Sequence, residues 1–328
     1  MANSSIYTKD KPRKDSLVEF FDKFGSEDKR IQYFIDMNFP TGYVCDHCGC
    51  HEYYLIKRKG IKNNYVLECA ECGHQVSLLS GTIFEGSNLS FLQLLIGLYV
   101  FFTNNSGVSA PDLANYMDIS LKSARRYAKK FRILMAESNN EKKLDAPFYE
   151  TDIIEYGGKK SDGVRGKGAD KQQVLLTVAT GEYNKYPLYI NLYPLPNHKA
   201  QPIKDYLTKH VVLGKDRTMS TDKDKSLLWL KDYVNLKNDV VDYDDPDHKM
   251  YWLNIFASNF ENNIKFIYRK IRKRDLPLYL AEQQYRANHR YTGKHFFEKI
   301  AKYIHKSTPI TNAQISKTIR NLNMQTDF

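Results

Sequence analysis

The chain has 328 residues, 42% of them hydrophobic, which is enough for about two or three domains with real cores. Lys and Arg number 49 against 38 Asp and Glu, and the resulting net charge of +11 favours a polyanionic partner such as DNA or RNA. The longest apolar run, 91–102, falls short of the roughly 20 residues of a membrane span, and the polar start lacks a signal-peptide core. We therefore expect a soluble intracellular protein and no membrane partner.

We expect the first 42 residues to form an N-terminal helical segment. Ser16–Phe24 and Glu27–Met37 both show the apolar spacing of a helix. The turn residues Phe39–Gly42 end this segment.

All five cysteines lie between positions 45 and 72, whereas a disulfide framework would be spread through the chain. Twenty residues separate two CxxC pairs, Cys45 with Cys48 and Cys69 with Cys72. Between the pairs, 53–57 and 65–68 alternate like the two strands of a ribbon. Because four thiolates satisfy a tetrahedral Zn2+ with no open position, we predict a structural zinc ribbon over residues 43–80. Spare candidate ligands are Cys50, His47, His51 and His74.

Residues 81–137 read as a helical domain with a helix-turn-helix. A helix over 90–102 precedes a short helix, 110–116, a turn at 117–119 and a longer helix, 121–136. This is the layout in which a recognition helix enters the major groove. The alternative is an ordinary amphipathic helix with a solvated basic face. The basic residues of this helix are Lys122, Arg125, Arg126, Lys129, Lys130 and Arg132.

A polar linker, 137–146, leads to a domain of different pattern over residues 147–292. Strands are predicted at 147–155, 174–179, 186–192 and 217–221, and helices at 199–212, 224–235, 251–268 and 276–288. Strands with interleaved helices indicate an α/β or α+β domain. Residues 293–328 read as a C-terminal tail.

Three motifs in order carry a family resemblance. Ser77–Gly86 reads SLLSGTIFEG, Asp152 precedes Gly157-Gly158-Lys159, and Tyr279–Arg290 reads YLAEQQYRANHR. Over about residues 40–292, the chain resembles ISXO-like insertion-sequence transposases, bacterial relatives of the Merlin transposons. The resemblance implies a multidomain α+β protein in which a zinc ribbon and helix-turn-helix precede a ribonuclease H-like α/β catalytic domain.

The resemblance also implies a core that cuts and joins DNA with two Mg2+ (or Mn2+) ions. Asp152 and Asp222 match the family's first and second aspartates, and Asp224 competes for the second position. Asp152 lies in mid-strand with the apolar neighbours Ile153 and Ile154, where a carboxylate is costly unless it binds something. For the third ligand, Asn259 matches the Asn of one family branch. Asn254, where that branch has His, is the fallback, and Glu261 replaces the usual Lys.

Two groups of basic residues fit a DNA path along phosphates, although solvated charge runs are common. The Gly-rich loop 157–173 carries Lys159, Lys160, Arg165, Lys167 and Lys171, and the segment after the third ligand carries Lys265, Arg269, Lys270, Arg272, Lys273 and Arg274.

These features predict a transposase that binds the inverted repeats of its own element and cleaves and transfers DNA strands. It would act on double-stranded element ends and target as a dimer or larger assembly, near the bacterial nucleoid. A domesticated, DNA-binding regulator and a nuclease without strand transfer are the alternatives.

Overall fold

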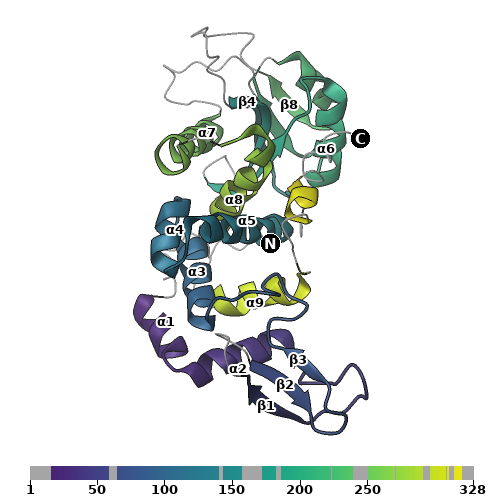
Figure 1. Cartoon of the computed structure of the whole chain (residues 1–328). Coiled ribbons are helices and arrows are strands. Elements are labelled where there is room, and N and C mark those ends of the chain that lie inside the picture. Colours follow the sequence, from purple (N-terminus) through teal and green to yellow (C-terminus); the bar gives the residue numbers. More distant parts are fainter. Residues whose placement is uncertain are drawn as a thin grey trace. The chain divides into compact units, whose positions relative to one another are not determined.

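The chain divides into two compact units, whose helices and strands are labelled in Figure 1. The first comprises Met1–Leu134 with Tyr291–Ile315, and the second Met135–Arg290 with Ser316–Phe328. The computed structural model describes residues 16–58, 65–139, 143–156, 172–181, 186–222, 224–238, 250–269, 271–290, 296–307, 309 and 314–319. In this part of the chain, no helix is long and apolar enough to cross a membrane.

The helices of the first unit begin where the sequence supplies capping residues. Ser16 and Ser90 each form a reciprocal capping box with the residue three positions on, which satisfies backbone N–H groups of the first turn. The close approach of α3 and α4 needs Gly97, because a Cβ there would lie 2.7 Å from the Met117 sulfur. The helices are α1 (Leu17–Phe24), α2 (Glu27–Asn38), α3 (Phe91–Thr103), α4 (Ala110–Met117), most of α5 (Leu121–Asn139) and α9 (Phe296–Lys306).

The segment predicted as a C-terminal tail contains α9, a helix of the first unit. The Phe297 ring lies 4.5 Å from that of Phe24 and 5.8 Å from that of Phe20, centroid to centroid. The Tyr33 hydroxyl donates a hydrogen bond to the Phe297 carbonyl oxygen at 3.0 Å. This helix was not predicted, although Phe297, Ile300 and Ile304 have helical apolar spacing, and its partners lie more than 250 residues earlier in the chain.

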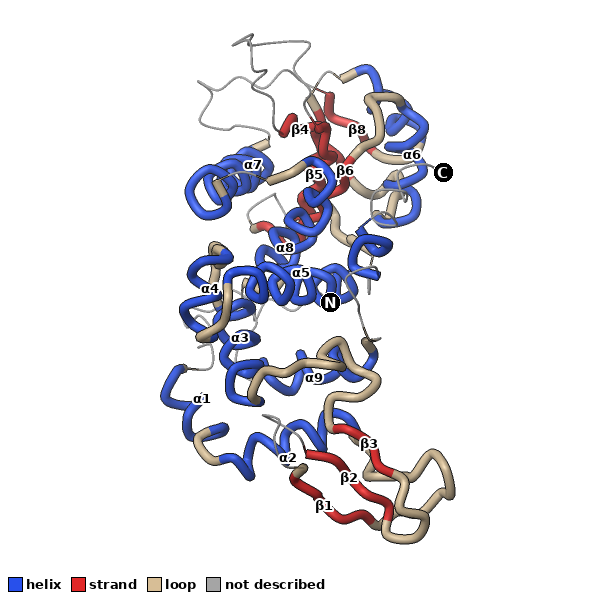
Figure 2. The backbone as a smooth tube through the Cα atoms, in the orientation of Figure 1, coloured by secondary structure: helices blue, strands red, loops and turns tan. Residues whose placement is uncertain are grey.

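The zinc-ribbon segment forms a three-stranded antiparallel sheet in the order β1-β2-β3. Figure 2 shows it as a separate small sheet, built from β1 (Tyr53–Lys57), β2 (Tyr65–Cys69) and β3 (Gln75–Ser77). The first two strands are as predicted. The sequence analysis missed β3, a strand of only three residues.

The second unit is built on a five-stranded sheet in the order β6-β5-β4-β7-β8. Strands β4, β5 and β6 are antiparallel, whereas β7 and β8 run parallel to β4. The strands are β4 (Phe148–Tyr156), β5 (Gln172–Thr180), β6 (Pro187–Pro194), β7 (Thr218–Thr221) and β8 (Asn235–Asn238).

Helices cover both faces of this sheet. On one face, Tyr149 and Met219 of the sheet pack against α6 (Ala200–His210) and the 3-10 helix η3 (Lys225–Asp232). On the other face, Leu176 and Leu192 pack against α7 (Tyr251–Asn263) and α8 (Leu276–Asn288). The unit is therefore a three-layer α/β structure.

Two segments differ from the predicted elements. In place of the single helix predicted for 224–235, the chain forms the shorter η3 and then β8. The helix ends early because the residues that follow it pair with β7 as a strand. The helix predicted for 251–268 changes at Ile264 to a π-helical turn, η4 (Ile264–Tyr268). It ends at Arg269, whose φ of 61° is rare for a residue with a side chain.

Side chains of α8 satisfy the outer edge of the sheet. Asn288 accepts a hydrogen bond from the Ile190 N–H at 2.7 Å and donates one to the Ile190 carbonyl oxygen at 3.0 Å. Gln284 accepts from the Leu192 N–H at 3.1 Å. Both amides belong to the YLAEQQYRANHR motif, which thus protects the exposed backbone of edge strand β6.

We expect Asn288→Ala to lower the free energy of unfolding of the second unit by about 1–3 kcal/mol, because it leaves the buried Ile190 amide without its side-chain partner. Both tryptophans, Trp229 and Trp252, lie in this unit, so urea unfolding followed by tryptophan fluorescence measures the effect. The exposed Gln201 of α6 gives the control: Gln201→Ala should change stability by under about 0.5 kcal/mol. Equal effects of the two variants would contradict the edge-protection role.

Candidate functional site

Four cysteine sulfurs of the ribbon converge on one point. The Cys45 and Cys72 sulfurs are 3.6 Å apart, and those of Cys48 and Cys69 are 3.4 Å apart. Four thiolates around Zn2+, with Zn–S bonds of about 2.3 Å, would be about 3.8 Å apart, so the cluster fits a tetrahedral zinc. Among the described residues, these cysteines are the single group of three or more metal-ligating side chains with ligand atoms within 4.8 Å.

Two matching backbone turns build this cluster. The N–H of Gly49 donates to the Cys45 carbonyl oxygen, and the N–H of Gly73 donates likewise to Cys69. Both glycines have a positive φ, 78° and 69°, which a residue with a Cβ adopts only with strain. The spare candidates His47, His51 and His74 are outside the cluster, and the Cys50 sulfur instead accepts the Glu52 N–H at 3.3 Å.

The two candidate catalytic aspartates lie side by side on neighbouring parallel strands. Thr151 of β4 pairs with Thr221 of β7, so Asp152 and Asp222 occupy the next positions of the two chains. Asp152 is half-buried and Asp222 is exposed. Because side chains alternate along a strand, Asp152 lies on the face of Glu150 and Ile154, which is the face that α7 covers.

The surroundings of Asp152 oppose its ionisation. Burial raises the pKa of Asp152 to about 6, against the opposing effect of the Ile153 N–H, which donates to its carboxylate at 2.7 Å. The carboxylates of Asp222 and Asp224 raise this pKa further. A partly buried carboxylate next to other carboxylates is typical of a site that holds a cation.

Asp224, the competitor for the second position, is already used by the fold. Its carboxylate caps η3 by accepting from the N–H and hydroxyl of Ser226 at 2.8 and 2.7 Å, and it pairs with His198. Burial by itself would raise the pKa of Asp224, but the hydrogen bonds from Ser226 and the neighbouring His198 lower it. This geometry favours Asp222 over Asp224 as the open ligand.

The candidates for the third ligand lie on opposite flanks of α7. Leu253 and Phe260 are buried against the sheet, seven residues apart on one stripe. Asn254 and Glu261 each follow a residue of this stripe and share one flank. Asn259 precedes Phe260 and lies on the other flank.

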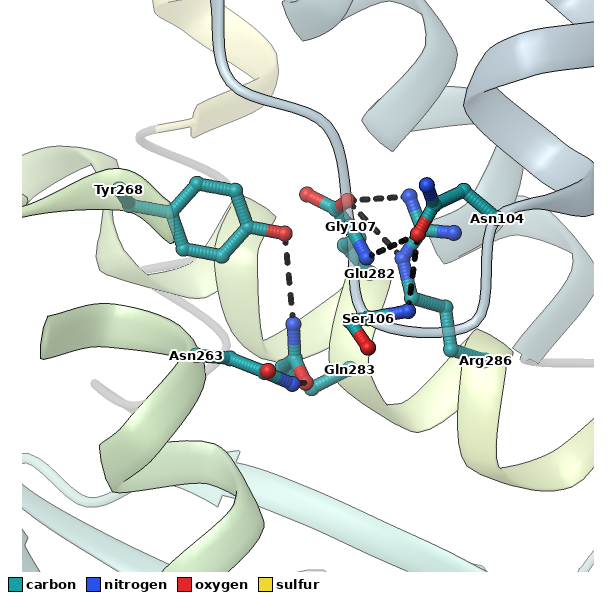
Figure 3. A network of polar contacts seen from close by, with 8 residues as sticks. All are labelled: Asn104, Ser106, Gly107, Asn263, Tyr268, Glu282, Gln283 and Arg286. Atoms are coloured by element: carbon teal, nitrogen blue, oxygen red, sulfur yellow. Dashed lines mark hydrogen bonds and ion pairs between the residues drawn. The ribbon is translucent and has the colours of Figure 1, made fainter. Parts of the chain in front are cut away.

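The flank of Asn259 faces α8. Figure 3 shows Asn263, one turn after Asn259, donating to Gln283 of α8 at 2.7 Å, and Gln283 donating to the Tyr268 hydroxyl at 3.4 Å. Asn259 itself is exposed, whereas Asn254 is half-buried. The arrangement therefore turns Asn254 and Glu261 away from α8.

The basic helix α5 presents only part of its charge to solvent. Lys122, Arg125 and Arg126 are exposed and Lys129 is half-buried. Lys130 and Arg132 were predicted as basic residues of the same helix. They are only 2% and 4% exposed and so are not available to DNA. Lys130 donates to the Ile83 carbonyl oxygen, and burial lowers its pKa to about 8.

The second basic group is partly described. Five residues of this group are exposed: Lys265, Arg269, Arg272, Lys273 and Arg274. Arg272 pairs with Asp275 at 2.7 Å. Outside the described residues lie the remaining predicted contacts, Lys159, Lys160, Arg165, Lys167, Lys171 and Lys270.

Comparisons with known proteins identify the class. Residues 25–75 match the family model of a transposase zinc-ribbon domain, and residues 142–288 match that of an ISXO2-like transposase domain. These matches define a transposase with a zinc ribbon. The chain belongs to the IS1595 family of transposases.

Among solved structures, the crystal structure of a pre-cleavage Mos1 transpososome is similar at 9% identity. The match covers 70% of this chain and 77% of that chain, with a TM-score of 0.26. No match was found among curated proteins.

Proposed function

We propose that the protein cleaves the DNA ends of its own insertion element and joins them to target DNA. The observation that carries this proposal is the parallel register of β4 and β7, which ends at the pair Thr151 and Thr221. The next residues of the two chains are Asp152 and Asp222, on the sheet face that α7 covers. An antiparallel trio of strands extended by two parallel strands, with helices on both faces, supports a ribonuclease H-like catalytic domain.

Oxygen ligands suit Mg2+ or Mn2+, and Asp152, Asp222 and an Asn of α7 would hold the metal. When bound, divalent metal activates the attacking oxygen and stabilises the leaving one. Asn254 is the better third ligand, because it is half-buried on the flank of α7 turned away from α8. This reverses the sequence preference for Asn259. Glu261 brings a carboxylate to the same flank of α7, at the position where the family usually carries Lys.

The test uses purified protein and DNA carrying the inverted repeats that flank its gene. With Mg2+ or Mn2+, the expected result is strand cleavage followed by joined products. Cleavage without joining would support a nuclease, and binding without cleavage would support a regulator. The uncharged third ligand favours the regulator as the second candidate.

DNA contact through α5 is the second part of the proposal. Short helix α4, the turn at Asp118 (φ 49°) and the basic start of α5 support a helix-turn-helix. The ribbon and this motif would bind element ends, and joining two ends would need a dimer or larger assembly.

We expect the double variant Arg125→Ala/Arg126→Ala to weaken binding to the inverted repeat and to reduce the slope of log affinity against log salt by about 2, roughly 1 for each lost phosphate contact. Fluorescence anisotropy over a range of salt concentrations measures this slope. The control is Lys209→Ala, since Lys209 is exposed on α6, on the sheet face opposite α7. A slope that stays unchanged in the double variant would remove α5 from the DNA interface.

A further inference from the structure

A second carboxylate of β4, Glu150, is buried beside the candidate metal site. Its side chain is 1% exposed, and it lies two residues before Asp152 on the same face of the strand. One carboxylate oxygen of Glu150 accepts a hydrogen bond from the backbone N–H of Leu253 at 2.6 Å. Leu253 lies in the first turn of α7 and immediately precedes Asn254.

This bond replaces a cap that α7 lacks. The first N–H groups of a helix have no partner within the helix and need one from elsewhere when buried. Met250 occupies the N-cap position of α7 and makes no side-chain cap hydrogen bond. A carboxylate from the sheet satisfies one of these groups and interacts favourably with the positive end of the helix.

The bond also fixes a distance that the proposed chemistry needs. It joins β4 to the first turn of α7. The bonded Glu150 lies two residues before Asp152, and the bonded Leu253 lies one residue before Asn254. A shift of α7 along the sheet would move the Asn254 amide relative to both aspartates.

We propose that Glu150 is a positioning residue, which caps α7 from β4 and so holds Asn254 in place to complete the metal site. The inference rests on the proposed function for its purpose, but the cap can be tested without any DNA chemistry. Glu150 itself touches neither the DNA nor the reacting atoms in this proposal.

The experiment compares Glu150→Leu with Glu150→Gln in the full-length, zinc-loaded protein. Gln keeps an oxygen that can accept the Leu253 N–H, whereas Leu fills similar space without an acceptor. The expected result for Glu150→Leu is faster hydrogen exchange at the Leu253 amide and Mn2+ binding weakened by about 10–100-fold. Glu150→Gln should keep Mn2+ affinity within roughly threefold of wild type, because it restores the cap.

Leu192→Ala is the control for general destabilisation, since Leu192 is buried on the same sheet face but lies on β6, two strands away from β4. It should lower stability while leaving Mn2+ affinity near that of wild type. The proposal is overturned if Glu150→Leu retains Mn2+ affinity, if Glu150→Gln loses as much as Glu150→Leu, or if Leu192→Ala weakens Mn2+ equally. Failure of wild-type protein to cleave its inverted repeats would refute the proposed function instead, and these Mn2+ and exchange results would still decide the cap.

Discussion

Replacing Asp152 with Asn should abolish strand cleavage while making the metal-free protein more stable at neutral pH. Loss of one of two charged ligands removes several kcal/mol of the stabilisation that the metal gives the transition state. The cleavage rate should therefore fall by more than roughly a thousandfold. A gel assay with labelled inverted-repeat DNA and Mg2+ or Mn2+ measures the fall. Cleavage at the wild-type rate would remove Asp152 from the catalytic machinery.

The stability gain follows from the raised pKa of Asp152. Folding raises this pKa from 3.8 to about 6, so the folded protein binds the proton more tightly than the unfolded chain. The ionised carboxylate therefore destabilises the fold above pH 6, by up to about 3 kcal/mol, and the penalty disappears as pH falls from 6 to 4. Asp152→Asn should raise the free energy of unfolding by about 1–3 kcal/mol at pH 7 and by little at pH 4.

Asp224→Asn is the matched control, because folding shifts the pKa of Asp224 in the direction opposite to that of Asp152. The pKa of Asp224 is lowered in the folded protein, so its carboxylate stabilises the fold above 3.8 and this contribution is lost as pH falls through the folded pKa. The Asn variant should therefore be less stable than wild type at pH 7. Added Mn2+ should raise the Tm of wild type and leave that of Asp152→Asn unchanged. Destabilisation by both variants at pH 7 would contradict the burial penalty at Asp152.

Removal of zinc should unfold the ribbon and leave the second unit folded. Zinc binding supplies about 10–16 kcal/mol to structural sites of this kind, far more than a three-stranded sheet gains from its small core. Cys69→Ser should lose the bound zinc, because hydroxyl oxygen is a poor replacement for a thiolate. We expect rapid proteolysis within 43–80 and loss of specific binding to the inverted repeat.

Two measurements make this prediction specific to the ribbon. Both tryptophans belong to the second unit, so the urea transition followed by their fluorescence should match that of wild type. Cys50→Ser is the matched variant, since the Cys50 sulfur lies outside the four-sulfur cluster, and it should keep about one zinc per chain. If Cys50→Ser loses zinc and Cys69→Ser retains it, the ligand assignment is wrong.

Local sequence determined the elements whose signals are local. Two CxxC pairs at the right spacing predicted the ribbon, and helical apolar spacing predicted α1 and α3. The change to short strand patterns after residue 147 predicted β4 to β7. The linked motifs indicated the transposase class before any geometry was known, and the family matches confirmed it.

Tertiary structure alone decided the features that depend on distant partners. Strand β8 forms because β7 supplies its hydrogen bonds, and α9 forms because Phe20, Phe24 and Tyr33 bury Phe297. The pairing of β8 is not visible in a local window of sequence, whereas Phe297, Ile300 and Ile304 of α9 do show helical apolar spacing.

The same distinction governs the candidate site. The sequence named Asp152, Asp222 and two asparagines, but spacing alone could not say which flank of α7 faces the aspartates. The hydrogen bond from Asn263 to Gln283 turns the flank of Asn259 toward α8, and on this ground we propose Asn254. Glu150 carried no sequence signal at all, because its role depends on the N–H of Leu253, a group 103 residues away that only the packing of α7 on β4 brings within 2.6 Å.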